Sequence, residues 1–176
     1  MIFAACVFLS VFVVTSLLLW MYDFLFSKHE KYRRMAKRQY RRIQAVINTP
    51  PDAFHIMRKM NPLVFEELVV YAISRKRHWK AWHGDRYSGD GGIDGYARYR
   101  GRKYYIQDKR YSGVINPQHV KSFAAILSRD RVMGIFVHTG RTGKGSQETR
   151  SGRMVFVSGN RLLELMDKRE KYFLFK

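Results

Sequence analysis

An uninterrupted apolar run at the N-terminus constrains the architecture of this chain more than any other feature. Ile2 to Tyr22 contains no charged side chain, and Asp23 ends the run. At 1.5 Å per residue this run would form a helix of roughly 31 Å, about the hydrocarbon thickness of a bilayer. Trp20 and Tyr22 lie where membrane-spanning helices carry interfacial aromatic residues. The run therefore predicts a transmembrane anchor over residues 1–26.

A cleaved signal peptide is the alternative for the same run. It fits less well, because no Lys or Arg precedes the apolar residues and no clear small-residue cleavage site follows them.

The segment after the anchor is strongly basic. Residues 28–48 hold one acid, Glu30, and eight basic side chains: Lys28, Lys31, Arg33, Arg34, Lys37, Arg38, Arg41 and Arg42. By the positive-inside rule, this excess predicts a single-pass protein of the inner or plasma membrane with its C-terminal part in the cytoplasm.

Helical spacing continues through this basic segment. One side of the helix would carry Tyr32, Met35, Ala36, Gln39, Ile43, Val46 and Ile47. A juxtamembrane helix lying on anionic lipid and a solvated stalk are both compatible with the pattern. Thr49-Pro50-Pro51 breaks the helix. We therefore divide the chain into an anchor (1–26), a basic juxtamembrane helix or linker (27–51) and a globular domain (52–176).

Composition limits the partners of that domain. The chain has 33 Lys and Arg against 14 Asp and Glu, a net charge of +19, and its 46% hydrophobic content excludes a disordered basic tail. A folded basic protein implies a polyanionic partner, either nucleic acid or an anionic membrane. The single cysteine excludes an intramolecular disulfide framework and a Cys-rich zinc site.

The globular part predicts a mixed α/β fold. Asn-Pro pairs at 61–62 and 116–117 are helix-start signals, and the apolar run Val132–Val137 is typical of a strand buried on both faces. The expected order is α-β-β-β-α-β-β-α, a mixed sheet flanked by helices. Its elements are helices from Asn61 and Asn116 and over 160–167, and strands over 79–83, 92–100, 103–111, 132–137 and 154–157.

A hairpin in this fold brings three polar residues to one face. If the loop is Gly101-Arg102, Asp94 pairs with Lys109, and Gln107 shares their face because side chains alternate along a strand. A three-residue bulged loop would shift this register. The three side chains suit divalent-metal phosphodiester chemistry: Asp94 and Gln107 supply oxygens to Mg²⁺, and Lys109 acts on the attacking water and the phosphate. An ordinary Asp–Lys cross-strand pair, worth under about 1 kcal/mol, is the alternative.

The residues around this hairpin resemble a known family. Ser88–Gly95 (SGDGGIDG) and Tyr105–Tyr111 (YIQDKRY) resemble the Mrr-type branch of the PD-(D/E)XK nuclease superfamily, in which Gln replaces the usual acid before X-Lys. The resemblance extends over roughly residues 61–166. It implies a restriction-endonuclease-like core and Mg²⁺-dependent cleavage of DNA, often modified DNA. It also implies that Asp94 is the metal-binding aspartate, that Gln107 and Lys109 are the Q-X-K pair, and that Glu66 is the helical acid that assists at the metal.

The chain departs from this family at Asp108, where relatives commonly carry a small or apolar residue. By alternation Asp108 points toward a face packed under helices, so it needs a partner such as Arg110 or a helix residue, or a place at the sheet edge. Asp90 fits either a second metal ligand or a turn former.

Several basic residues are candidates for DNA contacts. The Gly- and Arg-rich segment 140–153 is predicted to be a basic loop that contacts phosphates, and Arg110 follows the Q-X-K pair directly. The predicted DNA-binding residues are Arg110, Arg141, Lys144, Arg150 and Arg153. Trp79 and Trp82 fit either base stacking or core packing.

These patterns together predict a membrane-anchored, cytoplasm-facing, Mg²⁺-dependent DNA endonuclease acting on modified or foreign DNA. A protein that tethers DNA to the membrane without cutting it is the alternative, and an RNA-directed nuclease is a third reading. A homodimer would suit cleavage of both strands. The expected partners are therefore DNA, anionic lipid around a single-pass anchor, and a second copy of the chain.

Overall fold

A central sheet of five strands organises the domain, in the order β1-β2-β3-β4-β5. In this computed structural model, residues 2–84, 92–148 and 151–175 are described, with side chains missing from the description at 2–11 and 22–29. The first three strands form an antiparallel meander, and β3, β4 and β5 run parallel. The strands are β1 Trp79–Trp82, β2 Gly95–Tyr99, β3 Arg102–Lys109, β4 Met133–His138 and β5 Met154–Val157.

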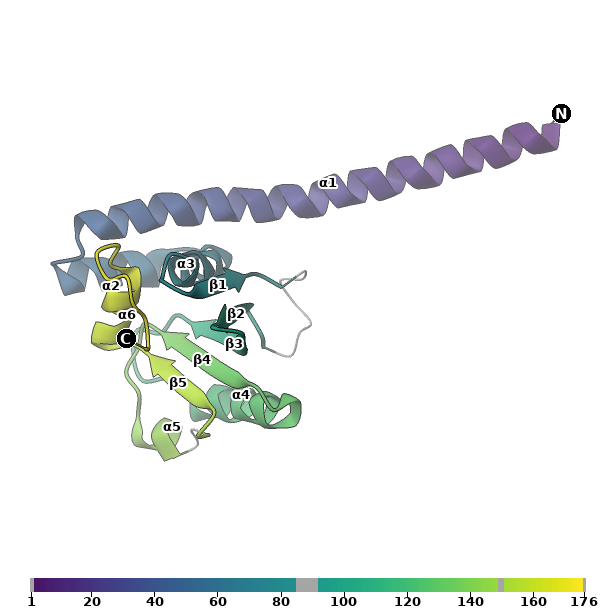
Figure 1. The fold of residues 1–176 in the computed structure, drawn as a ribbon. Helices are drawn as coiled ribbons and strands as arrows, with labels where there is room; N and C mark the ends of the chain where they lie inside the picture. Colours follow the sequence, from purple (N-terminus) through teal and green to yellow (C-terminus); the bar gives the residue numbers. More distant parts are fainter. Residues whose placement is uncertain (1, 85–91, 149–150, 176) are drawn as a thin grey trace.

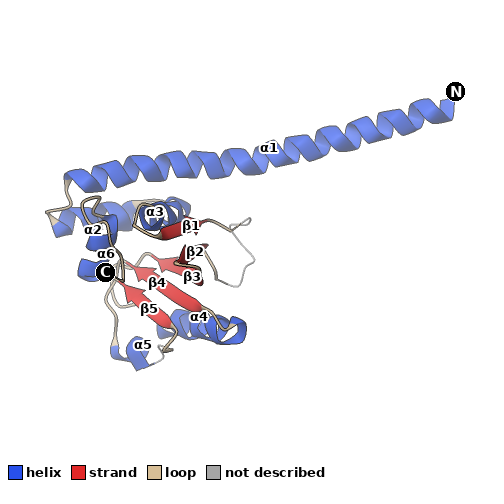
Figure 2. Cartoon of the chain, viewed as in Figure 1, coloured by secondary structure: helices blue, strands red, loops and turns tan. Residues whose placement is uncertain are grey.

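Helices cover both faces of this sheet (Figures 1 and 2). One core cluster joins the sheet to α1, α2, α3 and α6, and a second joins the opposite face to α4. The helices are α1 Ile2–Ala45, α2 Pro50–Lys59, α3 Pro62–Ser74, α4 Pro117–Asp130, α5 Lys144–Glu148 and α6 Gly159–Met166. The mixed α/β fold and its predicted element order are confirmed, with α2 and the short α5 as additions.

The two predicted helix starts are correct. The side chains of Asn61 and Asn116 accept hydrogen bonds from the backbone N–H groups of Leu63 and Gln118, each at 2.9 Å. A proline at the first turn loses no hydrogen bond there, because that N–H has no partner inside the helix.

The register predicted for the β2–β3 hairpin is wrong by two residues. Tyr99 pairs with Arg102, so the loop is Arg100-Gly101 rather than Gly101-Arg102. Both loop residues have positive φ, 46° and 89°. A two-residue loop of this type prefers glycine at its second position, which explains the choice. A shift of two residues preserves the face of every side chain, so the predicted common face survives although the pairing of Asp94 with Lys109 does not.

Helix α1 contributes to the core of the domain. Ala36, Tyr40 and Ile43 are buried, and the Tyr40 ring packs edge-on against Tyr71 of α3 at 5.2 Å between centroids. The N-terminal part of α1 projects away from the sheet (Figure 1). One side of the basic segment 27–51 is therefore packed on protein, an arrangement that neither a solvated stalk nor a helix lying on lipid anticipates.

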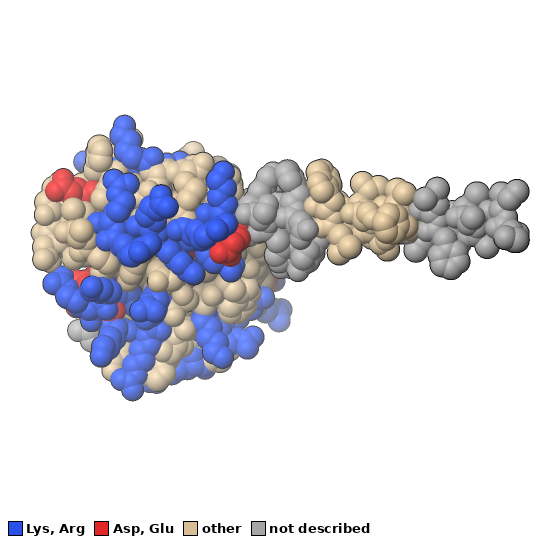
Figure 3. Space-filling model, turned by 90° about the horizontal axis from the view of Figure 1, so that it is seen from above, with Lys and Arg blue, Asp and Glu red and all other residues tan. Residues whose placement is uncertain are grey.

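The outer side of α1 is basic. Figure 3, which views the molecule from above, shows Lys and Arg side chains crowding the face on which α1 lies. Among the residues whose side chains are described, no helix has an apolar stretch long enough to cross a membrane. The predicted anchor (1–26) lies largely outside those residues, so it stays a prediction.

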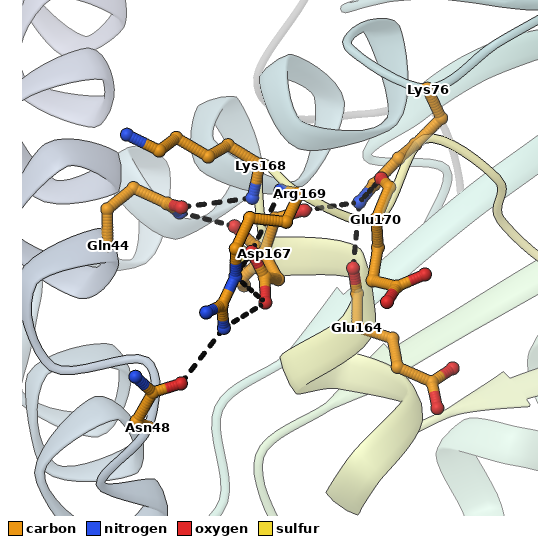
Figure 4. A network of polar contacts seen from close by, with 9 residues as sticks. Gln44, Asn48, Lys76, Glu164, Asp167, Lys168, Arg169 and Glu170 are labelled. Atoms are coloured by element: carbon orange, nitrogen blue, oxygen red, sulfur yellow. Dashed lines mark hydrogen bonds and ion pairs between the residues drawn. The ribbon is translucent and has the colours of Figure 1, made fainter.

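A polar network fastens the end of α1 to the C-terminal segment (Figure 4). The Gln44 side chain donates to the carbonyl of Met166 and accepts from the backbone N–H of Lys168. Arg169 donates to the Asn48 side chain at 2.9 Å. Helix α1 and the C-terminal segment are thus joined through residues more than a hundred positions apart.

Lys76 completes this region from the end of α3. Its ammonium group is buried and donates to the carbonyl oxygens of Glu164, Asp167 and Glu170 at 2.7, 2.9 and 2.7 Å. Burial lowers the pKa of Lys76 to about 8, against the opposing effect of the Asp167, Glu170 and Glu164 carboxylates. This side chain holds together the C-terminal end of α6 and the segment that follows it.

Candidate active site

Asp94 and Lys109 meet where β2 begins and β3 ends. Lys109 Nζ lies 3.7 Å from Asp94 Oδ2, and the same oxygen accepts a hydrogen bond from the backbone N–H of Asp108 at 2.8 Å. The backbone N–H of Asp94 donates to Ile106, which extends the hairpin by one residue and sets Asp94 opposite Gln107. The position of the Asp94 carboxylate is therefore fixed by backbone pairing of the hairpin.

Gln107 is the best-defined ligand candidate at this site. Its side chain is buried, and Nε2 donates to the carbonyl of Gly92 at 2.7 Å. That bond orients the amide and leaves Oε1 buried, with no hydrogen-bond partner among the described residues. A buried carbonyl oxygen that the protein leaves unpaired is available to a ligand or to water, because leaving it unpaired is energetically unfavourable.

Gly92 makes this arrangement possible in two ways. Its φ is +104°, a conformation that L side chains rarely adopt, and a Cβ at this position would lie 2.5 Å from Gln107 Nε2. The glycine-rich motif therefore serves the amide of Gln107 directly. The preceding motif residues, including Asp90, lie outside the described residues.

Glu66 joins the site from α3. Its pKa is raised to about 7, first by burial and then by the nearby Asp94 carboxylate, against the opposing effect of the Lys109 ammonium. His83 Nε2 lies 3.6 Å from Glu66 Oε2. A carboxyl with a pKa near neutrality can gain or lose a proton at physiological pH, which suits a general base.

The electrostatics of the other two carboxyls follow from burial. Burial raises the pKa of Asp94, against the effects of the Lys109 ammonium and the Asp108 N–H. Asp108 is more affected: burial, and then the negative charges of Asp94 and Glu66, raise its pKa well above the ordinary range. Neighbouring carboxyl groups repel one another when all are ionised, and a bound cation would relieve that repulsion.

Among the described residues, Asp108 does not pair with Arg110, the partner expected for it. Asp108 lies in the central strand rather than at a sheet edge, and its Oδ2 is buried without a partner among the described residues. Arg110 donates instead to the backbone carbonyls of Arg58 and Met60, at the end of α2. A neutral carboxylic acid is the form that this surrounding favours at Asp108.

The donor set fits a hard divalent cation. Asp94 offers a carboxylate oxygen and Gln107 the orphaned Oε1, and oxygen donors are those that Mg²⁺ prefers. Among the described residues, no group of three or more His, Cys, Asp or Glu side chains is arranged to hold a metal ion. Any further ligands would thus have to come from water, from substrate phosphate or from the part of the chain that is not described.

The predicted DNA-contact residues are spread over several environments. Arg141, Lys144 and Arg153 are exposed, with Lys144 at the start of α5. Arg110 is held by α2 as described above, and Arg150 lies outside the described residues. Of the two tryptophans weighed for base stacking, Trp79 is buried at 4% exposure, whereas Trp82 is 42% exposed and stacks on Tyr96.

Sequence reasoning missed two histidines near the site. His83 follows β1, and extending the observed β1–β2 pairing by one residue sets it opposite Gly95 beside Asp94. The β1 register, had it been predicted, would have found it. His138 pairs with Lys109 across β3 and β4, and burial lowers its pKa to about 4.

Comparison with known proteins identifies the family of this domain. The profile of the Mrr catalytic-domain family, described as restriction endonuclease, matches residues 57–166, well over half of the chain. Comparison with curated proteins and with solved structures finds no match. The matched range includes Glu66, the glycine motif and the Q-X-K pair, and it indicates a restriction-type nuclease domain with DNA as its substrate class. This chain therefore belongs to the Mrr-type restriction endonuclease family.

Proposed function

We propose that this protein is a membrane-anchored, Mg²⁺-dependent DNA endonuclease whose nuclease domain faces the cytoplasm and acts on foreign or modified DNA. One observation carries the metal-dependent part of the proposal: the orphaned Oε1 of Gln107, opposite the carboxylate of Asp94. A buried oxygen of this kind, held by a hydrogen bond from its own amide, is what a cation site requires before the cation binds.

The residues have distinct roles in this proposal. Asp94 and Gln107 would hold the Mg²⁺ ion, which supplies Lewis-acid activation of water and phosphate when bound. Lys109, 3.7 Å from Asp94, can orient the attacking water and offset charge on the phosphate. Glu66, with a pKa of about 7, can accept a proton from that water near neutral pH.

Exposed apolar residues support the membrane anchor. Residues 12–21 are exposed along α1, among them Phe12, Leu17, Leu18, Leu19 and Trp20. Water solvates such a helix poorly, whereas the apolar run Ile2–Tyr22, to which these residues belong, has the length of a bilayer span. The basic residues that follow favour the cytoplasmic orientation. A homodimer would present one site to each DNA strand, so we extend the proposal to a homodimer on DNA.

A second candidate function is a DNA tether that does not cut. The Lys109–Asp94 pair favours it, because an ion pair of this kind can be purely structural. In this alternative the basic surface would still bind DNA, but neither Mg²⁺ nor Lys109 would matter.

The test uses the full chain in detergent micelles with methylated and unmethylated plasmid, in Mg²⁺ or EDTA. We expect cleavage in Mg²⁺ alone, and a loss of at least about a hundredfold in Lys109→Ala and Asp94→Asn with DNA binding retained. Lys121→Ala, at an exposed position on α4, is the control for charge removal. DNA retardation without cleavage, unchanged by Lys109→Ala, would establish the tether instead.

A further inference from the structure

The exposed side of α1 forms a continuous basic surface, which we call the basic ridge. It consists of Lys31, Arg34, Lys37, Arg38, Arg41 and Arg42, all exposed. The opposite side of the same helix is buried in the domain through Ala36, Tyr40 and Ile43. Packing of the apolar side therefore determines that the ridge faces outward, and it lies within the basic face seen in Figure 3.

The ridge carries charge that the protein itself does not neutralise. The sequence has no Asp or Glu from Lys31 to Ala45. Among the described residues, Arg34 alone of the six has an ion-pair partner, the exposed Glu30 at 3.8 Å. Arg34 and Arg38, Lys37 and Arg41, and Arg38 and Arg42 are each four residues apart, a spacing at which like charges repel across one helix face.

A solvated helix face normally interleaves acids with bases, because the pairs stabilise the helix. The ridge instead accumulates repulsion that a bound polyanion would relieve. Its charge pattern therefore indicates an anionic partner rather than solvent.

The ridge is a rigid part of the nuclease domain. Tyr40 and Ile43 hold α1 on α3, and Gln44 and Asn48 bind the segment after α6 (Figure 4). Because the backbone of α1 is fixed on the domain, the ridge can determine the orientation of a partner as well as attract it.

The helix that carries the ridge packs on the helix that carries Glu66. Arg33, next to the ridge residue Arg34 in the sequence, lies 3.9 Å from Glu67 of α3. Glu67 follows Glu66 directly, and Glu66 is the acid of the candidate site. A polyanion lying along the ridge would therefore be held on the outer side of a helix that packs against α3.

Two anionic partners are conceivable, and the geometry of α1 separates them. The helix is unbroken from the apolar run to the ridge, and Lys37 is 14 residues beyond Asp23. At 1.5 Å per residue this places Lys37 about 21 Å from the end of the run, or about 16 Å at a steep 40° tilt. The attraction of anionic lipid decays over a Debye length of about 8 Å. With the proposed anchor in place, most of the ridge therefore lies beyond the reach of the headgroups.

We propose that the basic ridge binds the phosphate backbone of duplex DNA and holds the substrate along α1. From Lys31 to Arg42 the ridge is roughly 17 Å long, which matches about five successive phosphates of one strand. This inference rests on the proposed function in that it takes DNA as the polyanion. It does not require that the site cleaves.

The test measures binding of a duplex oligonucleotide to the full chain in phosphatidylcholine nanodiscs, in EDTA and on a Lys109→Ala background. The ridge variant Lys37→Gln/Arg38→Gln/Arg41→Gln keeps good helix formers at exposed positions. Each lost phosphate contact should weaken binding roughly eightfold at 0.1 M salt and reduce the slope of log affinity against log salt by about 0.9.

The matched control removes the same charge from the opposite face of the sheet, with Lys121→Gln/Arg129→Gln/Arg131→Gln on and just after α4. In the control, we expect the slope of log affinity against log salt to differ from that of the parent by no more than the loss of one phosphate contact, about 0.9. An equal loss in the control would overturn the proposal, because the effect would then be one of net charge alone.

A second arm adds phosphatidylserine to the discs. If the ridge lies on lipid, the added anionic lipid should weaken DNA binding by the parent, and ridge substitutions should remove that effect; this result would also overturn the proposal. EDTA and the Lys109→Ala background prevent cleavage in this assay, so it measures DNA binding alone. A wrong assignment of the ridge is therefore distinguished from a wrong assignment of the nuclease activity.

Discussion

Gln107 donates its side-chain amide to the carbonyl of Gly92 at 2.7 Å, and this bond decides which end of the side chain is left for a ligand. With Nε2 occupied, the remaining polar atom is Oε1, the carbonyl oxygen, which is buried and without a partner among the described residues. An acidic side chain at position 107 would place a carboxylate oxygen, instead of Nε2, against the Gly92 carbonyl oxygen. These two oxygens would repel each other. The chain thus gives a physical reason for Gln, rather than an acid, at this position.

Gly92→Ala should therefore impair the site. A Cβ would come within 2.5 Å of Gln107 Nε2 at a φ of +104°, so the amide must move or the glycine turn must change. We expect cleavage to fall at least about tenfold, and stability to fall by about 1–2 kcal/mol from backbone strain. Cleavage rates as a function of Mg²⁺ concentration, together with urea unfolding, measure the two effects.

Two other glycines separate strain from steric overlap. Gly101 has φ +89° but no heavy atom within 4 Å of an added Cβ, and Gly113 has neither constraint. Gly101→Ala should lose stability without losing cleavage, and Gly113→Ala should change neither. Equal activity in Gly92→Ala and Gly113→Ala would disprove the role of the Gly92–Gln107 pair.

Acid should destabilise the fold through His138. Its pKa is about 4 in the folded protein because the ring is buried, against an ordinary 6.5. The unfolded chain binds this proton first, so the stabilisation is complete above pH 6.5 and is lost as the pH falls toward 4. Linkage gives a contribution of His138 alone of about 2 kcal/mol lost at pH 5 relative to pH 7.

Urea unfolding at pH 7 and pH 5 of the parent and of variants isolates this contribution, because the raised pKa of Glu66 acts in the opposite direction over the same range. Between pH 7 and pH 5, His138→Gln should lose about 2 kcal/mol less stability than the parent, whereas His55→Gln, at an exposed position on α2, should follow the parent. Equal pH dependence in His138→Gln and the parent would disprove the role of His138.

The sequence predicted most of the nuclease core, because each of its signals is local. The Asn-Pro caps, the alternation of the hairpin and the apolar run of β4 depend on neighbouring residues alone. The common face of Asp94, Gln107 and Lys109 was predictable for the same reason: a hairpin register error of two residues leaves the faces unchanged. The roles of these residues in the reaction stay predictions.

Long-range packing was not predictable in this way. The stripe of Ala36, Tyr40 and Ile43 resembles the apolar side of any amphipathic helix, and only the fold shows that α3 covers it. The bonds of Gln44 and Asn48 to the C-terminal segment carry no sequence signal at all. Arg110 was assigned to DNA from its charge and its neighbours, and its bonds to the end of α2 likewise depend on the tertiary fold.

The packing of α1 predicts a large effect of mutations far from the site. Ile43→Ala should destabilise the domain by about 2–4 kcal/mol, because a fully buried side chain is truncated and leaves a cavity. Arg41→Ala, two residues away and exposed, should change stability by less than about 0.5 kcal/mol. Chemical unfolding of the full chain in micelles compares them.

A truncation series tests the same packing. A fragment that begins at Pro50 lacks Ala36, Tyr40 and Ile43, whose burial is worth about 5 kcal/mol, a large part of the stability of a typical domain. A fragment that begins at Ser27 retains them. We expect the longer fragment to unfold cooperatively and the shorter one to be unfolded or much weaker. Equal stability of the two would show that α1 packs on the domain without supporting it.

Lys76 should be a stabilising residue in spite of its burial. Its ammonium group satisfies three backbone carbonyls at the end of α6 and beyond, and a carbonyl group left buried without a donor costs about 1–3 kcal/mol. Lys76→Met keeps the apolar stem but removes every donor, so we expect a loss of about 3 kcal/mol or more. Lys80→Met, at an exposed position on β1, is the matched control and should be nearly neutral. If Lys76→Met unfolds at the same urea concentration as the parent, water has replaced the ammonium group. The three hydrogen bonds would then contribute no net stability to the fold. Hydrogen exchange at the end of α6 would show in that case whether the helix end has frayed or is unchanged.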